Sequence, residues 1–113
     1  MTIINSVLIA NRGEIAIRIS KTLNEMGIKA YGIYSKDDSS SAHLSYCSEV
    51  FELNGTGPSA YLNIYEIISL AKSKKIKAVH PGYGFLSENH AFAASCAKND
   101  IIFIGPNSKR YPY

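Results

Sequence analysis

Two hydrophobic patterns alternate along this chain: short continuous apolar runs, and segments in which apolar residues have helical spacing. Five short apolar runs have the composition of buried strands: residues 3–4 with 7–10, 29–34, 49–53, 76–79 and 101–104. Between these runs, apolar residues recur every three or four positions, which is the spacing of an amphipathic helix. This order predicts an α/β domain with a mainly parallel five-stranded sheet. Because the strands are continuous apolar runs, we expect both faces of the sheet to be covered, in a three-layer Rossmann-like arrangement.

The helices can be placed by their apolar stripes and by the residues that begin or end them. The first should span Glu14 to Met26 and end at Gly27. Its core-facing stripe comprises Ile15, Ile19, Leu23 and Met26. We expect a short helix around His43, a helix that follows Ser59 as its N-cap, and a helix over residues 88–98.

Polar residues and glycines follow the first, third and fourth strands, where parallel strands should end at one rim of the sheet. That rim would carry Asn11, Arg12, Gly55, Thr56, His80, Tyr83 and Glu88. Open α/β sheets bind ligands at the carboxyl ends of their strands. This rim is therefore the candidate site.

The segment His80-Pro81-Gly82-Tyr83-Gly84-Phe85-Leu86-Ser87-Glu88-Asn89 lies on this rim. Glycine permits backbone torsions and close approaches that a side chain would forbid, which favours Gly82 and Gly84 in a shaped loop. Tyr83 could face the cleft or only brace the loop. Glu88 fits either a dipole-compensating acid in the first helical turn or a carboxylate in the site. His80 is interpreted as a hydrogen-bond partner that fixes the loop, rather than as a proton shuttle.

The first turn, Asn11-Arg12-Gly13, is also interpreted as having a structural role. A side-chain hydrogen bond or a salt bridge that anchors this turn is favoured over contact with a substrate.

Two loops come close to the dinucleotide-binding pattern G-x-G-x-x-G/A, one from Gly55 to Ala60 and one from Gly82 to Ser87. That fingerprint also requires an acidic residue about 20 positions further on, which would hold the ribose. Val79 and His80 occupy this place after the first loop, and Ile104 and Gly105 after the second. A free nucleotide-binding domain is therefore not favoured.

Charge and composition argue against nucleic-acid-binding and membrane proteins. The chain has 113 residues, the size of one domain, and a net charge of +3. Its one dense lysine cluster, Lys72 to Lys77, falls at a helix end, where cations complement the dipole, so we expect no nucleic-acid partner. No apolar run approaches the ~18 residues of a membrane span, and no signal peptide is evident, so we expect a cytoplasmic protein without membrane contact.

The metal-ligating residue types are scattered. Cys47 and Cys96 lie far apart and are interpreted as free, partly buried thiols. His43 and His90 have no acid or cysteine at metal spacing, and we expect both at the surface. No metal site is predicted.

Three segments together carry a resemblance to a known family. They are Ile9-Ala10-Asn11-Arg12-Gly13-Glu14-Ile15-Ala16, Ser59-Ala60-Tyr61-Leu62-Asn63-Ile64, and the motif from His80 to Asn89 with Phe103-Ile104-Gly105-Pro106 after it. Their order and spacing resemble the N-terminal, pre-ATP-grasp domain of biotin carboxylase. The resemblance covers about residues 3 to 107, and we place the domain at residues 1–107 with a tail of a different kind at 108–113.

The resemblance implies an ATP-dependent ligase reaction carried out by a larger enzyme. In that family, ATP activates bicarbonate and the carboxyl group passes to biotin on a carrier protein, with Mg²⁺ or Mn²⁺ accompanying ATP. It also implies that Tyr83, Gly84, Glu88 and His80 form a wall at the biotin. Asn11, Arg12, Gly13 and Gly82 are interpreted from their place in the turns as residues that fix the loops. Arg18, Lys21 and Glu25 match a homodimer contact, although an ordinary solvated helix face with an i,i+4 ion pair is favoured.

The metal carboxylates and ATP lysines of the family belong to its later domains. We therefore expect this chain alone to bind no cofactor and to be catalytically incompetent, because phosphoryl transfer needs metal ligands and cationic clamps. Its expected partners are the remaining carboxylase domains and the biotin carboxyl carrier protein, with a weak homodimer at most. The alternative function is a stand-alone module that docks on a carboxylase or carrier protein.

Overall fold

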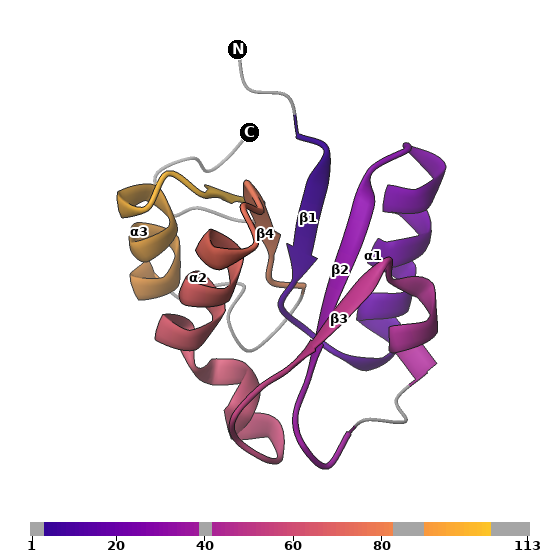
Figure 1. The fold of residues 1–113 in the computed structure, drawn as a ribbon, viewed down its shortest axis with the longest axis horizontal. Coiled ribbons are helices and arrows are strands. Elements are labelled where there is room, and N and C mark those ends of the chain that lie inside the picture. The colour runs from indigo at the N-terminus through magenta and orange to yellow at the C-terminus, as the bar shows by residue number, and fades with distance from the viewer. Residues whose placement is uncertain (1–3, 39–41, 83–89, 105–113) are drawn as a thin grey trace.

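The computed structural model describes residues 4–38, 42–82 and 90–104 of the chain (Figure 1). Strands and helices alternate along these residues. In chain order they are β1 (Ser6–Ile9), α1 (Gly13–Glu25), β2 (Lys29–Tyr34), the 3₁₀ helix η1 (Ala42–Tyr46), β3 (Glu49–Glu52), the 3₁₀ helix η2 (Pro58–Leu62), α2 (Ile64–Ser73), β4 (Ala78–His80), α3 (His90–Lys98) and β5 (Ile102–Phe103).

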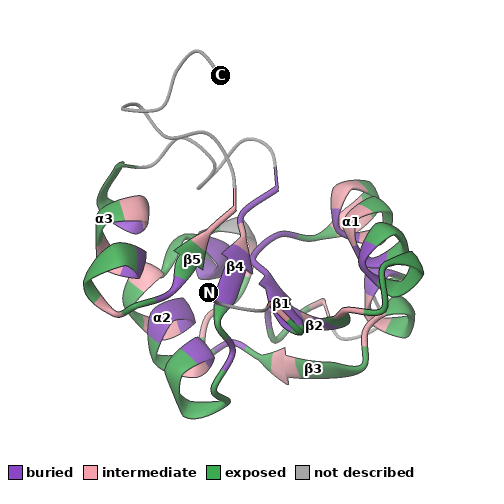
Figure 2. Ribbon diagram, turned by 90° about the horizontal axis from the view of Figure 1, so that it is seen from above, coloured by how far each residue is buried: buried purple, intermediate pink, exposed green. Residues whose placement is uncertain are grey.

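The strands form one parallel sheet in the order β3-β2-β1-β4-β5. β1 occupies the centre, where Val7 pairs with Ala30 on one side and with Ala78 on the other. Figure 2 shows α1 on one side of this sheet and α2 on the other. The predicted three-layer α/β fold with a five-stranded parallel sheet is confirmed.

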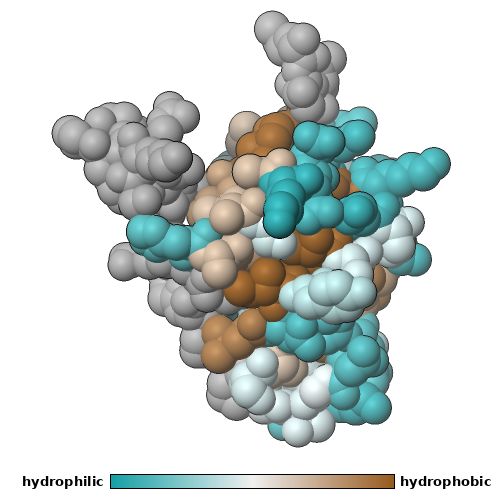
Figure 3. Space-filling model, turned by 90° about the vertical axis from the view of Figure 1, so that its left-hand side faces the viewer, coloured by the Kyte–Doolittle hydropathy of each residue, from teal (hydrophilic) through white to brown (hydrophobic). Residues whose placement is uncertain are grey.

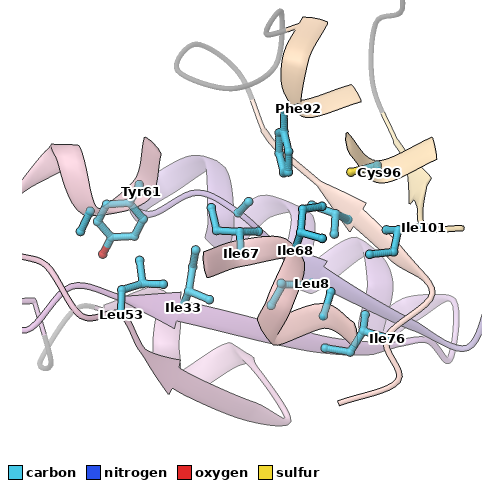
Figure 4. Close-up of a cluster of buried hydrophobic side chains, with 14 residues drawn as sticks. Leu8, Ile33, Leu53, Tyr61, Ile67, Ile68, Ile76, Phe92, Cys96 and Ile101 are labelled. Carbon is cyan, nitrogen blue, oxygen red and sulfur yellow. The ribbon is translucent and has the colours of Figure 1, made fainter. Parts of the chain in front are cut away.

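Two apolar clusters occupy the two faces of the sheet. The larger joins alternate residues of β1, β2 and β4 to the inner sides of α2 and α3, and Figure 4 shows Tyr61 at one end of it and Ile76 and Ile101 at the other. The smaller cluster lies under α1 and contains Val7, Ile9, Ala16, Leu23, Ala30 and Ala78. Alternate residues of each central strand thus enter opposite cores, as the pleat requires.

The buried face of α1 differs from the predicted stripe. Ala16, Ser20 and Leu23 are buried, whereas Met26 is 65% exposed, so its assignment to the core was wrong. The helix ends at Glu25, and Met26 no longer shares its inner face. Ser20 is tolerated in the interior because its Oγ donates to the carbonyl oxygen of Ala16 at 2.8 Å.

The N-cap of α2 is Asn63, and the prediction of Ser59 was wrong. The Asn63 side-chain oxygen accepts a hydrogen bond from the N–H of Glu66 at 3.0 Å, as an N-cap does. Ser59 lies within η2, which begins at Pro58 and precedes α2. The chain therefore makes a short 3₁₀ helix before the α-helix starts.

Two expectations about exposure also fail on the β2–β3 side. β3 is an edge strand whose residues are mostly exposed, so burial of every strand on both faces was wrong. His43, expected at the surface, is fully buried in η1, with Nε2 lying 3.0 Å from the carbonyl oxygen of Ile33. That hydrogen bond with the β2 backbone satisfies a ring nitrogen that would otherwise be costly to bury.

Both cysteines are free, as predicted. Burial raises the pKa of the Cys96 thiol to about 12, so this sulfur packs as an apolar group at neutral pH. Of the helices that the structure describes, none combines the length and the hydropathy that a bilayer crossing needs.

Candidate site between the first and fourth strands

The sheet has a topological switch point between its two central strands. From β1 the chain moves to β2 on one side, and from β4 it moves to β5 on the other. The loops that leave β1 and β4 therefore diverge, and this is where open parallel sheets form ligand crevices. The N–H of Ala10 donates to the carbonyl oxygen of His80 at 2.8 Å and extends the pairing of the two strands to the rim.

Asn11 joins the two loops. Its side chain is 3% exposed, and its Nδ2 donates to the carbonyl oxygen of Pro81 at 2.8 Å. Its Oδ1 accepts from the N–H of Arg12 at 2.7 Å and braces its own turn. One amide thus connects segments that are 70 positions apart in the sequence.

Gly82 lies directly against this amide. Its φ is +74°, a conformation that costs other residues energy, and a Cβ here would lie 2.9 Å from Cγ of Asn11. Both the backbone conformation and the available space therefore require glycine. The close approach fixes where the chain enters the segment that begins with Tyr83.

His80 provides a second support for the same turn. The buried Gly82 N–H donates to Nδ1 of His80 at 3.0 Å. Burial lowers the pKa of the His80 imidazole below its ordinary value, so the ring is neutral at pH 7. A neutral ring is what the hydrogen bond needs, because Nδ1 must accept.

Sequence reasoning missed a polar network beside this turn. The guanidinium of Arg12 forms an ion pair with Asp38, with 2.9 Å between Nε and Oδ2, and lies 5.8 Å from the ring centre of Tyr61. The Tyr61 hydroxyl donates to Oδ2 of Asp38 at 2.8 Å and accepts from the N–H of Ser35 at 3.0 Å. Burial raises the pKa of Tyr61, so the hydroxyl keeps its proton and remains a donor.

Asp37 extends this network to the loop after β3. Its Oδ1 accepts from Oγ of Ser35 at 2.7 Å and from the N–H of Gly57 at 3.0 Å. The turn after β2 thus ties the first turn to η2. A signal was present, since parallel strands end at one rim and Asp37 and Asp38 come three and four residues after the end of the second strand.

The ion pair gives a pH-dependent prediction. The hydrogen bond from Arg12 holds the pKa of Asp38 below its usual value of about 3.9. Its contribution to the free energy of unfolding should therefore be complete above about pH 4 and be lost as the pH falls through the lowered pKa. Because Arg12 is 43% exposed, the coupling energy should be only ~0.2–1 kcal/mol at pH 7.

A double-mutant cycle with Arg12→Gln and Asp38→Asn, followed by urea unfolding at pH 7 and pH 2.5, measures this coupling. The interaction should be present at pH 7 and weaker at pH 2.5. Equal coupling at the two pH values would show that the lowered pKa does not reflect this ion pair.

The structure brings Asn11, Arg12, His80 and Gly82 together at one rim, with Gly13 at the start of α1. Gly55, also expected there, accepts from the N–H of Lys36 at 3.1 Å. Tyr83, Gly84 and Glu88 lie outside the described residues, as does the proposed boundary at residue 107. The dipole-compensating and site roles of Glu88 both stay predictions.

The three α1 residues matched to a dimer contact, Arg18, Lys21 and Glu25, are all exposed. In the described part of the chain, the Arg12–Asp38 contact is the one ion pair, so the expected pair between Lys21 and Glu25 is not formed. Lys21 instead lies 5.3 Å from the ring centre of Tyr46. Arg18 lines a hollow of about 280 Å³ together with Ile15, Ile19, Thr22, Leu23 and His80.

The metal-ligating side chains of the described residues do not gather at one place. Over residues 4–38, 42–82 and 90–104, no three His, Cys, Asp or Glu side chains gather in a way that could hold a metal ion. Arg12, the cation at the turn, is engaged with Asp38. On the described rim, Asn11, Gly82 and His80 fix the position at which the chain leaves β4 for the following loop.

Comparison with known proteins shows the family to which this chain is similar. The family model described as "Biotin carboxylase, N-terminal domain" matches residues 3–110. The chain is 50% identical over 109 residues to the pyruvate carboxylase of Bacillus subtilis, covering 94% of this chain and 9% of that protein. It is 48% identical over 102 residues to biotin carboxylase 2 of the same organism, covering 89% and 23% respectively.

A solved structure of a biotin carboxylase domain is similar to this chain. The biotin carboxylase domain dimer of the 2-oxoglutarate carboxylase of Hydrogenobacter thermophilus, in complex with MgADP, ADP and bicarbonate, superposes with a TM-score of 0.91 at 39% identity. The match covers 96% of this chain and 24% of that one. In these three comparisons the chain spans less than a quarter of its relative's length.

Proposed function

The chain belongs to the family of biotin carboxylase N-terminal domains, and from that membership we propose that it forms one wall of the active site of a biotin-dependent carboxylase. The complete enzyme would use ATP with Mg²⁺ or Mn²⁺ and bicarbonate to carboxylate biotin on a carrier protein. The observation that supports this role is the clamp across the switch point, in which Asn11 binds the Pro81 carbonyl and packs on Gly82. This clamp sets the start of the segment that contains Tyr83, Gly84 and Glu88.

The proposed role of the chain is positional. Asn11, Gly82 and His80 hold the loop entry, and Arg12 holds the first turn against the turn after β2. Tyr83, Gly84, Glu88 and His80 would line the site at the biotin. The ATP and metal ligands would come from the remaining carboxylase domains.

The described surface is compatible with neighbouring domains. Its exposed large hydrophobic residues are Met26, Tyr46, Val50, Leu62, Tyr65 and Ile102. Figure 3 shows apolar atoms reaching the surface between polar side chains on the side that carries α2 and α3. The support for further polypeptide packing on this domain is length, since relatives that match it are several times longer.

A chimera tests the proposed function. The aligned segment of this chain replaces the corresponding N-terminal segment of biotin carboxylase 2 of Bacillus subtilis, to which it is 48% identical. We expect the chimera to hydrolyse ATP in a bicarbonate- and biotin-dependent manner, whereas the same enzyme with the segment deleted should be inactive. A folded chimera without this activity would contradict the proposal.

The isolated chain provides the complementary measurement. Purified 113-residue protein should show no bicarbonate-dependent ATP hydrolysis and no micromolar ATP binding by calorimetry. Turnover or tight ATP binding would contradict the assignment of the nucleotide site to other domains. Specific binding to a whole, intact carboxylase, together with an inactive chimera, would favour the alternative of a stand-alone docking module.

A further inference from the structure

The Pro81–Gly82 turn is held from several sides at once. Pro81 is buried, and its carbonyl oxygen accepts from Asn11 at 2.8 Å. The buried Gly82 N–H donates to Nδ1 of His80 at 3.0 Å. A buried backbone N–H needs an acceptor, and this ring nitrogen provides it.

The hydrogen bond fixes the protonation state of the imidazole. A neutral histidine has one nitrogen that donates and one that accepts, and a protonated histidine has two donors. Since Gly82 donates to Nδ1, the proton of the neutral ring resides on Nε2. Protonation of Nδ1 would place two donors against each other and leave the Gly82 N–H without its acceptor.

The surroundings of His80 also favour the neutral ring. On α1, the hollow beside it is lined by Ile15, Ile19, Thr22 and Leu23, with Arg18 as the one charged group among these described lining residues. On the neighbouring strands, His80 pairs with Ile9 of β1, and Ile104 follows β5. Arg18 offers an imidazolium no opposite charge, and burial disfavours the charged ring.

We propose that His80 is a positioning residue whose unprotonated Nδ1 holds the Gly82 end of the Pro81–Gly82 turn, so that the Gly82 N–H keeps its acceptor only while the ring is neutral. Its importance for the site rests on the proposed function, because Gly82 directly precedes Tyr83. The hydrogen bond itself does not depend on that function. This hydrogen bond is complete above the pKa of free histidine, about 6.5, and is lost as the pH falls through the lower pKa of His80.

Nuclear magnetic resonance of the 113-residue chain tests this directly. The ¹⁵N shift of Nδ1 should be that of an unprotonated ring nitrogen at pH 7. On acidification, the amide proton of Gly82 should move upfield and exchange faster with water, with the same apparent pKa as the His80 ring and below 6.5. A Gly82 amide that does not follow the ring, or a ring that carries its neutral-state proton on Nδ1, would overturn the proposal.

Two matched variants distinguish the loss of the hydrogen-bond acceptor at position 80 from the loss of a group that titrates. In His80→Asn, the side-chain Oδ1 can take the place of Nδ1 as an acceptor that does not titrate, so the Gly82 amide should stay protected from pH 7 to pH 5. In His80→Leu, that protection should fall at least tenfold already at pH 7. Equal Gly82 exchange in the two variants would overturn the proposal.

The chimeric carboxylase separates this inference from the proposed function. If it is active, both variants should lose the part of the acid limb of the pH–rate profile that comes from His80, and His80→Asn should keep more activity at pH 7 than His80→Leu, because it keeps an acceptor for the Gly82 N–H. Unchanged profiles in both variants would count against the positioning role. An inactive chimera together with the expected Gly82 titration would refute the proposed function and leave the His80 hydrogen bond established.

Discussion

Replacing Tyr61 with alanine should lower the free energy of unfolding by about 3–5 kcal/mol, the usual cost of truncating a buried aromatic residue. The ring is 1% exposed and closes one end of the larger core, where Figure 4 shows it near Leu53 and Ile33. Domains of this kind have total stabilities of only ~5–15 kcal/mol. Urea unfolding followed by circular dichroism should therefore show a much lower midpoint or no folded baseline.

Tyr65 provides a matched control, since it is 82% exposed on the first turn of α2. Tyr65→Ala should change stability by no more than ~0.5 kcal/mol. Tyr61→Phe keeps the ring but removes the hydroxyl that serves Asp38 and Ser35, and should cost about 1–3 kcal/mol. A Tyr61→Phe variant as stable as the wild type would show that the polar network contributes nothing to the rim.

Gly82→Ala should be the most damaging single change at the switch point. The positive φ costs an L-residue ~1–2 kcal/mol. Overpacking against the Asn11 side chain should add about 1–3 kcal/mol. The summed loss of stability is measurable by thermal or urea unfolding of the isolated chain.

Gly27 provides a control that shows the conformational part of this loss alone. Its φ is +76°, close to that of Gly82, but a Cβ there would meet no atom within 4 Å. Gly27→Ala should therefore show only the conformational cost. In an Asn11→Ala background, which removes the amide but keeps a Cβ 3.0 Å away, the penalty of Gly82→Ala should fall toward that of Gly27→Ala. An undiminished penalty would mean that the amide is not what excludes a side chain at position 82.

The sheet and its order of elements could be predicted from the sequence because they depend on period and composition. The runs at 29–34 and 49–53 correspond closely to β2 and β3. Details that depend on one tertiary contact could not be predicted. His43 has no sequence feature that distinguishes it from a surface histidine, and its burial depends on the Ile33 carbonyl oxygen lying within reach of its ring.

The candidate rim was predictable in position but not in its contacts. Topology places Asn11, Arg12 and His80 at the carboxyl ends of strands, and the structure has them there. Sequence alone does not state that Arg12 pairs with Asp38, since the two residues are 26 positions apart. The choice of Asn63 over Ser59 as N-cap likewise required knowing that η2 comes between Ser59 and α2.

The central place of β1 has a consequence for synthesis of the protein. A nascent chain can pair β1 with β2 early, but the other edge of β1 must wait for β4, whose last residue is His80. During that delay, the free edge of β1 and the part of the larger core that Val79, Phe92 and Cys96 complete are open to other polypeptides in the cell. Translation pauses or chaperone binding before about residue 80 should therefore decide how much of this domain reaches its native state.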